Sequence, residues 1–320
     1  MVSSSKSLVL ASLLTFTCLT LSSTAAAFAF SSVVAAPSFS SPVNISNDAN
    51  QAHYPWVANV GSNVYVAWTE EDHGIFFRAS SNDGGSWSPP LSSPGLRISP
   101  HGGVASYPIV YALGNFVYVT WSQSVNKQLQ VFFAASSNNG ASFSKAIQLT
   151  SGVSKNGFIT PVIAAAGSNV YIAYTGNGKN SYVVWSNNNG ATWHGPNFYA
   201  PDHEPQIAAV GNNAYAIADG VVVYVTNNAG ASWYTSITSV NNGDEPWIAA
   251  SGSYVYIVSQ TKTTAGKIHF FYSNNVGKVG SWTPSKEPGV VLSGAVTQGD
   301  AWEPQITASG NYLYLTFHEL

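Results

Sequence analysis

The feature that most constrains this chain is a repeated pattern, Pro-x5-Gly-x3-Tyr, whose internal spacing does not change. Its six copies begin at Pro55, Pro108, Pro161, Pro205, Pro246 and Pro304. In every copy a valine or isoleucine stands two positions after the proline. Proline is tolerated at the start of a strand, glycine turns the chain, and tyrosine and β-branched residues favour strands. Each copy therefore predicts two antiparallel strands joined by a tight turn, and the constant spacing predicts six equivalent units.

A second motif, [Ser/Thr]-x-Asn-x-Gly-x-[Ser/Thr]-[Trp/Phe], follows five of the six copies. It begins at Ser80, Ser136, Ser186, Thr226 and Ser273, and the last copy contains two extra residues before its aromatic residue. An Asn-x-Gly segment between two strand-like runs predicts a hairpin, so each unit gains a third and a fourth strand. A four-stranded antiparallel sheet of ~40–50 residues is the size of one propeller blade. The sequence therefore predicts an all-β, six-bladed β-propeller, and six in-register copies disfavour a β-sandwich with accidental periodicity.

This second motif resembles the Asp-box, or BNR repeat, of the sialidase superfamily, Ser-x-Asp-x-Gly-x-Thr-Trp, and the resemblance extends from about residue 54 to the end of the chain. Asn stands where the family usually has Asp, and Asn makes a similar bond from its side chain to the backbone. The resemblance implies that the box is a structural hairpin on the face away from the active site. Its aromatic residues are then expected to pack in the fold, and they are Trp87, Phe143, Trp193, Trp233 and Trp282.

Sialidase activity itself is not expected. Sialidases hold the substrate carboxylate with three arginines, whose planar groups suit bidentate binding. The whole chain contains two arginines, Arg78 and Arg97. The family's Arg-Ile-Pro motif before the first blade is replaced by His53-Tyr54-Pro55 or is absent.

The N-terminal residues resemble a secretory signal. Lys6 precedes an apolar run over 8–21, and Ala25-Ala26-Ala27 offers small residues for cleavage. We therefore expect a signal peptide at 1–27, a secreted or cell-surface location, and one propeller domain at 28–320. The only cysteine, Cys18, lies in the predicted signal, so no disulfide is expected. The predicted blades lie near residues 54–94, 107–150, 160–200, 204–239, 245–293 and 303–320, the last completed by the N-terminal segment 28–46, which closes the ring.

Charge and composition limit the partners. The formal net charge is −3 and charged residues make up 8% of the chain, with no cationic stripe for nucleic acid. The apolar N-terminal run is shorter than the ~20 residues of a membrane span. We expect an extracellular glycan or surface protein as the partner, and a monomer, with self-assembly as the alternative.

Most of the 14 acidic residues fall in loops before the first strand or after the second strand of a unit. In this topology those loops share one face, and binding residues concentrate on loops that a rigid scaffold carries. Glu204, Glu245 and Glu303 each stand directly before a strand-starting proline, where the first two units have Tyr54 and Tyr107. The predicted ligand-binding residues are His53, Tyr54, Tyr107, His203, Glu204, Asp244, Glu245, Trp302 and Glu303.

Three uses of the carboxylates remain open. Asp202, Glu204, Asp244 and Glu245 could coordinate Ca²⁺, which prefers six to eight oxygen ligands. Two of Glu204, Glu245 and Glu303 could cleave a glycosidic bond, or all could bond to loop amides. No cofactor is required by the sequence. The leading hypothesis is a secreted, non-catalytic binding protein for glycans; the alternatives are a glycoside hydrolase or lyase and a self-assembling envelope or filament subunit.

Overall fold

The computed structural model describes residues 14–15, 41–47, 51–70, 74–151, 160–176, 179–200, 205–218, 222–237, 243–261, 266–284, 290–293, 301–310 and 312–319. Its elements are all β-strands. In chain order they are β1 (Leu14–Thr15), β2 (Ala52–Val60), β3 (Asn63–Glu70), β4 (Gly74–Ser80), β5 (Leu96–Arg97), β6 (Ala105–Leu113), β7 (Phe116–Val125), β8 (Gln128–Ser136), β9 (Ile147–Gln148), β10 (Val162–Ala166), β11 (Asn169–Thr175), β12 (Ser181–Ser186), β13 (His194–Ala200), β14 (Gln206–Val210), β15 (Asn213–Ala218), β16 (Val222–Thr226), β17 (Tyr234–Ile237), β18 (Gly243–Ser251), β19 (Tyr254–Thr261), β20 (Ile268–Ser273), β21 (Trp282–Thr283), β22 (Val290–Val291), β23 (Ala301–Ser309) and β24 (Tyr312–Glu319). No helix in the described part of the chain is long and apolar enough to cross a membrane.

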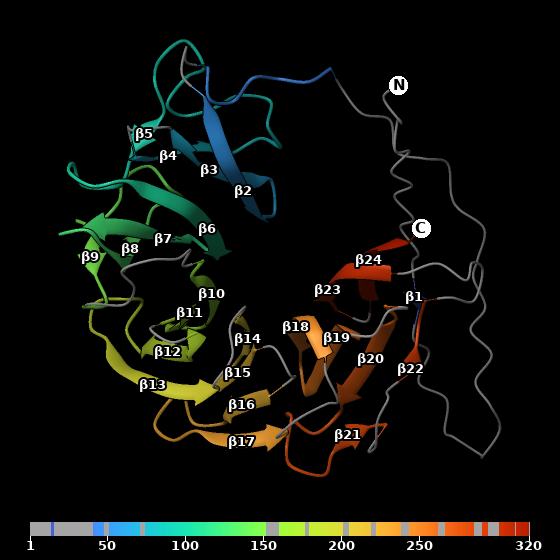
Figure 1. Cartoon of the computed structure of the whole chain (residues 1–320). Helices are drawn as coiled ribbons and strands as arrows, with labels where there is room; N and C mark the ends of the chain where they lie inside the picture. Colours follow the sequence, from blue (N-terminus) through green and yellow to red (C-terminus); the bar gives the residue numbers. More distant parts are fainter. Residues whose placement is uncertain are drawn as a thin grey trace, which may run out of the picture.

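These strands form antiparallel sheets that follow one another around a common centre, in the arrangement of propeller blades (Figure 1). The first four sheets are β2–β5, β6–β9, β10–β13 and β14–β17, each in sequential order. The fifth contains β18–β21 with β22 paired to β20, and the sixth contains β23, β24 and β1. The first strand of each sheet lies nearest the centre. The predicted four-stranded antiparallel sheets are thus confirmed for the first four units.

The core lies between successive sheets, and it explains the first repeat. The tyrosine of one sheet belongs to the same buried cluster as the valine or isoleucine that follows the proline of the next sheet. These inter-sheet pairs are Tyr65 with Val110, Tyr118 with Ile163, Tyr171 with Ile207, Tyr215 with Ile248, and Tyr256 with Ile306. Burial of such side chains contributes roughly 1.5–3 kcal/mol each, so the repeat encodes contacts between neighbouring sheets as well as strands.

The second repeat forms the expected hairpin. The Ser86 backbone N–H donates to Asn82 Oδ1 at 2.8 Å, and the Gly84 N–H donates to Ser80 Oγ at 2.9 Å. The next three copies make the same two bonds. The aromatic residue then packs on the preceding sheet: the Phe143 ring lies 4.8 Å from Phe77, edge to face. The box therefore has a structural role, because its aromatic residue packs one sheet against the preceding one.

The sixth sheet differs from the prediction. Its strand β24 pairs with β1, through Leu14 and Leu313, and β1 lies inside the predicted signal peptide. Within the predicted closing segment 28–46, residues 28–40 lie outside the described residues. The described part lies against the first sheet instead, where the carbonyls of Ile45 and Ser46 accept bonds from Arg78 at 2.7 and 3.4 Å. The physical reason is that the fully buried Arg78 guanidinium needs carbonyl acceptors for its N–H groups.

Candidate ligand-binding site

The inner strands of four sheets carry the same β-bulge immediately before the repeat proline. The residue at the bulge has a left-handed backbone in each case: φ is 51° at Tyr54, 57° at Tyr107, 46° at Glu245 and 51° at Glu303. Such values are uncommon outside glycine, and a bulge re-aims the side chain of its strand. Strained backbone of this kind costs on the order of 1–3 kcal/mol and is concentrated at functional sites. The four residues occupy equivalent positions at the start of their strands, and this layer is called the mouth.

One side of the mouth is aromatic. The rings of Tyr54 and Tyr107 lie 4.2 Å apart with an interplanar angle of 38°, and the Tyr107 hydroxyl donates to that of Tyr54 at 3.3 Å. The His53 ring lies 6.0 Å from Tyr54. Burial raises the pKa of Tyr107 to about 12, and the hydrogen bond that its hydroxyl donates to Tyr54 adds to the rise. The two rings present an aromatic surface that is half exposed at Tyr54.

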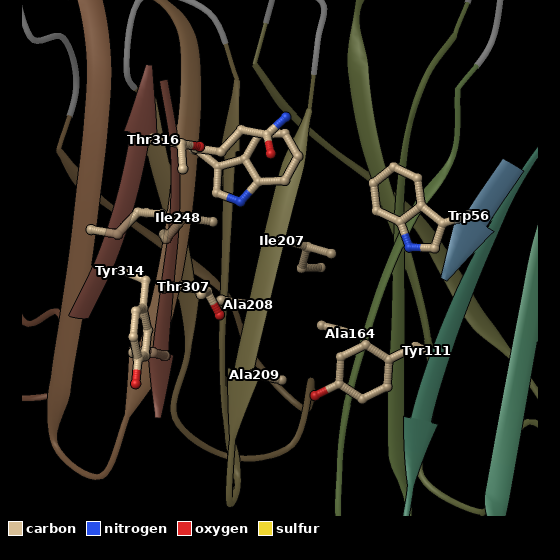
Figure 2. A pocket seen from close by; sticks show the side chains of 16 residues that line it. Trp56, Tyr111, Ala164, Ile207, Ala208, Ala209, Ile248, Thr307, Tyr314 and Thr316 are labelled. Atoms are coloured by element: carbon tan, nitrogen blue, oxygen red, sulfur yellow. The ribbon is translucent and has the colours of Figure 1, made fainter. Parts of the chain in front are cut away.

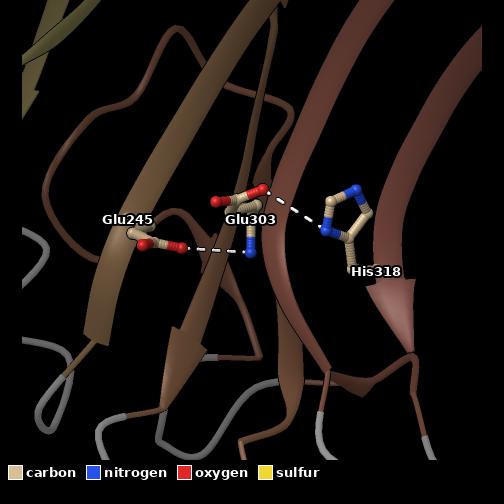
Figure 3. Close-up of polar contacts among 3 residues, drawn as sticks. All are labelled: Glu245, Glu303 and His318. Atoms are coloured by element: carbon tan, nitrogen blue, oxygen red, sulfur yellow. Dashed lines mark hydrogen bonds and ion pairs between the residues drawn. The ribbon is translucent and has the colours of Figure 1, made fainter. Parts of the chain in front are cut away.

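The other side is acidic (Figure 3). Glu245 Oε2 accepts a bond from the Glu303 backbone N–H at 3.0 Å, which links the bulges of β18 and β23. Glu303 Oε2 lies 3.3 Å from His318 Nδ1, and both side chains are exposed. The Trp302 ring stands edge to face with His318, with the centroids 6.3 Å apart. Glu245 thus stabilises local backbone, and the Glu303 carboxylate faces solvent beside a histidine.

The structure brings the predicted site residues together as two groups. His53, Tyr54 and Tyr107 form the aromatic group, and Glu245, Trp302 and Glu303 form the acidic one, with Asp244 directly before Glu245. Asp202, His203 and Glu204 lie outside the described residues. In the described ranges, no three His, Cys, Asp or Glu side chains are grouped so that they could hold a metal ion. The calcium site stays a prediction that depends on Asp202 and Glu204.

Further along the inner strands, the sheets line an open cavity of about 520 Å³ (Figure 2). Its aromatic walls come from Trp56 and Trp247, each one residue after a repeat proline, and from Tyr111 and Tyr314. The polar lining groups are Gln305, Thr307 and Thr316. Alanines supply much of the remaining wall, at Ala164, Ala208, Ala209, Ala249, Ala250 and Ala308.

The sequence did not predict this cavity. Trp302 was predicted to bind a ligand, and Tyr111 and Gln305 were not singled out. The sequence feature that could have indicated the cavity is the residue three positions after the proline, which is alanine in four of the six copies. Because strand side chains alternate, that position faces the same side as the tryptophans, and its small size leaves space between the sheets.

Neither arginine lies at the mouth or in the cavity. Arg78 is fully buried and donates to the carbonyls of Ile45 and Pro90, both at 2.7 Å. Arg97 donates from Nε to the Ser99 carbonyl at 3.2 Å. Since the chain has no other arginine, neither the mouth nor the cavity contains a guanidinium group.

Comparison with known proteins gives structural similarity alone. No family model matches the chain, and no curated protein matches it. A Trypanosoma rangeli sialidase in complex with the inhibitor DANA is 13% identical, with a TM-score of 0.47, over 84% of this chain and 55% of the sialidase, so the chain spans about half of that protein. A protein of unknown function from Dyadobacter fermentans is 13% identical over 85% of this chain and 95% of its own, with a TM-score of 0.49. The GH93 alpha-L-arabinofuranosidase of Fusarium graminearum is 12% identical over 84% and 93%, with a TM-score of 0.47. Similarity at this level assigns no activity to the chain.

Proposed function

We propose that the chain is a secreted, six-bladed glycan-binding propeller that binds a neutral sugar in its central cavity and does not cleave it. The observation that carries the proposal is the cavity of about 520 Å³ lined by Trp56, Trp247, Tyr111 and Tyr314 with a few amide and hydroxyl groups. Ligand pockets are typically ~300–1,000 Å³, mostly apolar, with a small number of polar groups that fix orientation. The C–H faces of a sugar ring pack on aromatic rings, and its hydroxyls bond to groups such as Gln305 and Thr316.

Binding without cleavage is favoured by what the mouth carboxylates already do. Glycoside cleavage needs one carboxyl group as the acid and another as the base or nucleophile, on either side of the bond. Glu245 instead accepts the backbone N–H of Glu303, and Glu303 lies against His318. The first contact gives the Glu245 carboxylate a structural role at the mouth, and the second places the exposed Glu303 carboxylate beside a histidine.

A glycoside hydrolase is the second candidate, since Glu245 and Glu303 stand at equivalent positions on neighbouring inner strands. Release of reducing sugar from a panel of glycans separates the two candidates. We expect none above the buffer rate, and release that disappears in Glu303→Gln would establish the hydrolase instead.

The test of binding is a glycan array with the secreted protein, followed by calorimetry on a glycan that binds. Trp56→Ala and Trp247→Ala should each weaken that glycan about tenfold, because losing one buried aromatic contact costs ~1.5 kcal/mol. The matched control is Phe198→Ala, since Phe198 is an exposed aromatic residue on the outer strand β13. An array without a bound glycan, or tryptophan variants that bind as well as the control, would contradict the proposal.

A further inference from the structure

The side chains that line the cavity fall into two layers along the inner strands. Trp56, Trp247 and Gln305 each stand one residue after a repeat proline. Tyr111 and Thr307 each stand three residues after one. Because alternate residues of a strand point to the same side and a strand rises about 3.3 Å per residue, the two sets lie roughly 7 Å apart along the strands. The first set is called the outer layer, since it is nearer the mouth, and the second is called the inner layer.

The sixth sheet contributes a second strand to both layers. Thr316 of β24 pairs with Gln305 and so belongs to the outer layer, whereas Tyr314 pairs with Thr307 and belongs to the inner layer. Figure 2 shows the same division, with Thr316 near the level of Trp56 and above Tyr314. Each layer therefore combines two aromatic rings with polar side chains of the sixth sheet.

The two layers have similar chemistry. The outer layer has two indole rings with the Gln305 amide and the Thr316 hydroxyl, and the inner layer has two phenol rings with the Thr307 hydroxyl. The Tyr111 hydroxyl donates to the Ala165 carbonyl at 3.1 Å, so this residue offers its ring to a ligand. Aromatic rings pack on the C–H faces of sugars, and amide and hydroxyl groups both donate to and accept from sugar hydroxyls. Each layer thus has the groups that bind one sugar unit.

The charge of the cavity limits the kind of sugar. None of the described residues that line the cavity is charged. Moving an unpaired charge from water into such a site is costly. Both layers therefore favour uncharged sugar units over uronic acids and over amino sugars with a free amine.

We propose that the cavity binds two consecutive units of a linear, uncharged glycan, one unit in each layer, with the glycan chain running along the inner strands from the mouth. This inference rests on the proposed function and specifies its ligand as two linked sugars of a chain. The layers repeat the same chemistry at a separation on the scale of one sugar unit, which matches a ligand that itself repeats. A monosaccharide occupies the outer layer alone, because the indole rings there offer the larger contact area.

The test is the dependence of affinity on glycan length. The probes are the mono-, di-, tri- and tetrasaccharides of β-1,4-linked glucose, mannose, xylose and N-acetylglucosamine, each titrated into the secreted protein by calorimetry. In a series that binds, the disaccharide should bind at least about tenfold more tightly than the monosaccharide, because it gains a second aromatic layer. The third and fourth units should lower Kd by less than about threefold, since they extend beyond both layers. Digalacturonic acid is the charged control and should bind at least about tenfold more weakly than the best disaccharide.

Variants assign each sugar unit to its layer. Tyr314→Ala should weaken the disaccharide about tenfold and leave the monosaccharide unchanged. Trp247→Ala should weaken both probes, and Phe198→Ala, on the outer strand β13, should weaken neither. Thr307→Val removes only a hydroxyl from the inner layer, and it should also weaken the disaccharide alone. Because the readout compares two ligands on the same variant, a general loss of stability does not produce it.

The other outcomes are distinct. Equal affinity for the mono- and disaccharide, or a steady gain up to the tetrasaccharide, would overturn the two-layer assignment and leave the proposed function in place. Tyr314→Ala and Thr307→Val variants that weaken both probes alike would also overturn it. Tight binding of digalacturonic acid would show that the ligand need not be uncharged. If no series binds, the inference is overturned, and the glycan array decides the proposed function separately.

Discussion

Two tyrosine hydroxyls in the core, those of Tyr171 and Tyr215, are buried without a hydrogen-bond partner among the described residues. In the first two sheets the equivalent hydroxyls donate to Asn139 and Asn189 of the following box. The third and fourth tyrosines meet boxes that have Ala229 and Val276 at that position, with no side-chain acceptor. We therefore predict that Ala229→Asn and Val276→Asn each stabilise the protein.

The magnitude has two parts. A buried hydroxyl without a partner costs ~1–3 kcal/mol, and a new hydrogen bond recovers about 1 kcal/mol of it. Ala229 and Val276 also have φ of 57° and 47°, which Asn tolerates better than Ala and much better than β-branched Val. Val276→Asn buries less apolar surface, and this loss offsets part of the larger stabilisation that comes from relieving the unfavourable backbone conformation of valine. We expect each variant to gain roughly 1–2 kcal/mol, which corresponds to about 2–6 °C in Tm.

The assay is thermal and denaturant unfolding of these single variants and of variants that remove the equivalent hydrogen bond where it exists. Asn189→Ala should lower stability by ~1–3 kcal/mol, because it leaves the Tyr118 hydroxyl buried without its acceptor. Tyr118→Phe should also destabilise, whereas Tyr171→Phe should be close to neutral. If Asn189→Ala destabilises while both new asparagines have no effect or destabilise, the equivalence of the four positions is wrong.

Four further predictions need simpler measurements. A fluorogenic sialoside should show no turnover above buffer, because both arginines donate to backbone carbonyls; robust hydrolysis would contradict this. Burial raises the pKa of Tyr118 and of Tyr171 to about 12, so stability should be complete below the unfolded value of ~10 and fall as the pH rises towards 12; an unchanged unfolding free energy from pH 9 to 12 would refute it. If Asp202 and Glu204 help to bind Ca²⁺, a chelator should lower Tm and Glu204→Gln should remove the response, whereas an unaffected melting curve would reject the metal. N-terminal sequencing of secreted protein should begin near Phe28, and an intact Met1 would reject the signal peptide.

The sequence was sufficient to predict the sheets because each residue type in the repeat favours one local backbone conformation. Proline, glycine and the Asn-x-Gly box mark where strands start and turn, and those choices hold in the structure. The partner of β24 could not be predicted in the same way, because the pairing of strands distant in sequence depends on which other contacts the N-terminal segment can make. The carbonyls of residues 45–46 accept hydrogen bonds from the buried Arg78 side chain, and the repeat pattern gives no sign that this side chain needs acceptors.

The mouth was partly predictable. Position alone indicated Tyr54, Tyr107, Glu245 and Glu303, because each precedes a repeat proline. The bulge that turns these residues was not predictable, since a strand with period two gives no sign of an extra residue. The bond from the Glu303 amide to Glu245 was not predictable either, because it joins the inner strands of two consecutive sheets at positions 58 residues apart in the sequence.

The six copies within one chain allow packing positions to be separated from recognition positions. Two residues after the proline every copy has valine or isoleucine, and in the second to sixth sheets this side chain packs on the preceding sheet. One residue before the proline the copies read Tyr, Tyr, Thr, Glu, Glu and Glu. One residue after it they read Trp, Ile, Val, Gln, Trp and Gln, and the two tryptophans and the last glutamine line the cavity. Packing between sheets requires the same shape six times, whereas a bound ligand meets each sheet once and from a different side. If the proposed glycan binds in the cavity, the varied positions that line it, at Trp56, Trp247 and Gln305, are the ones that would select it.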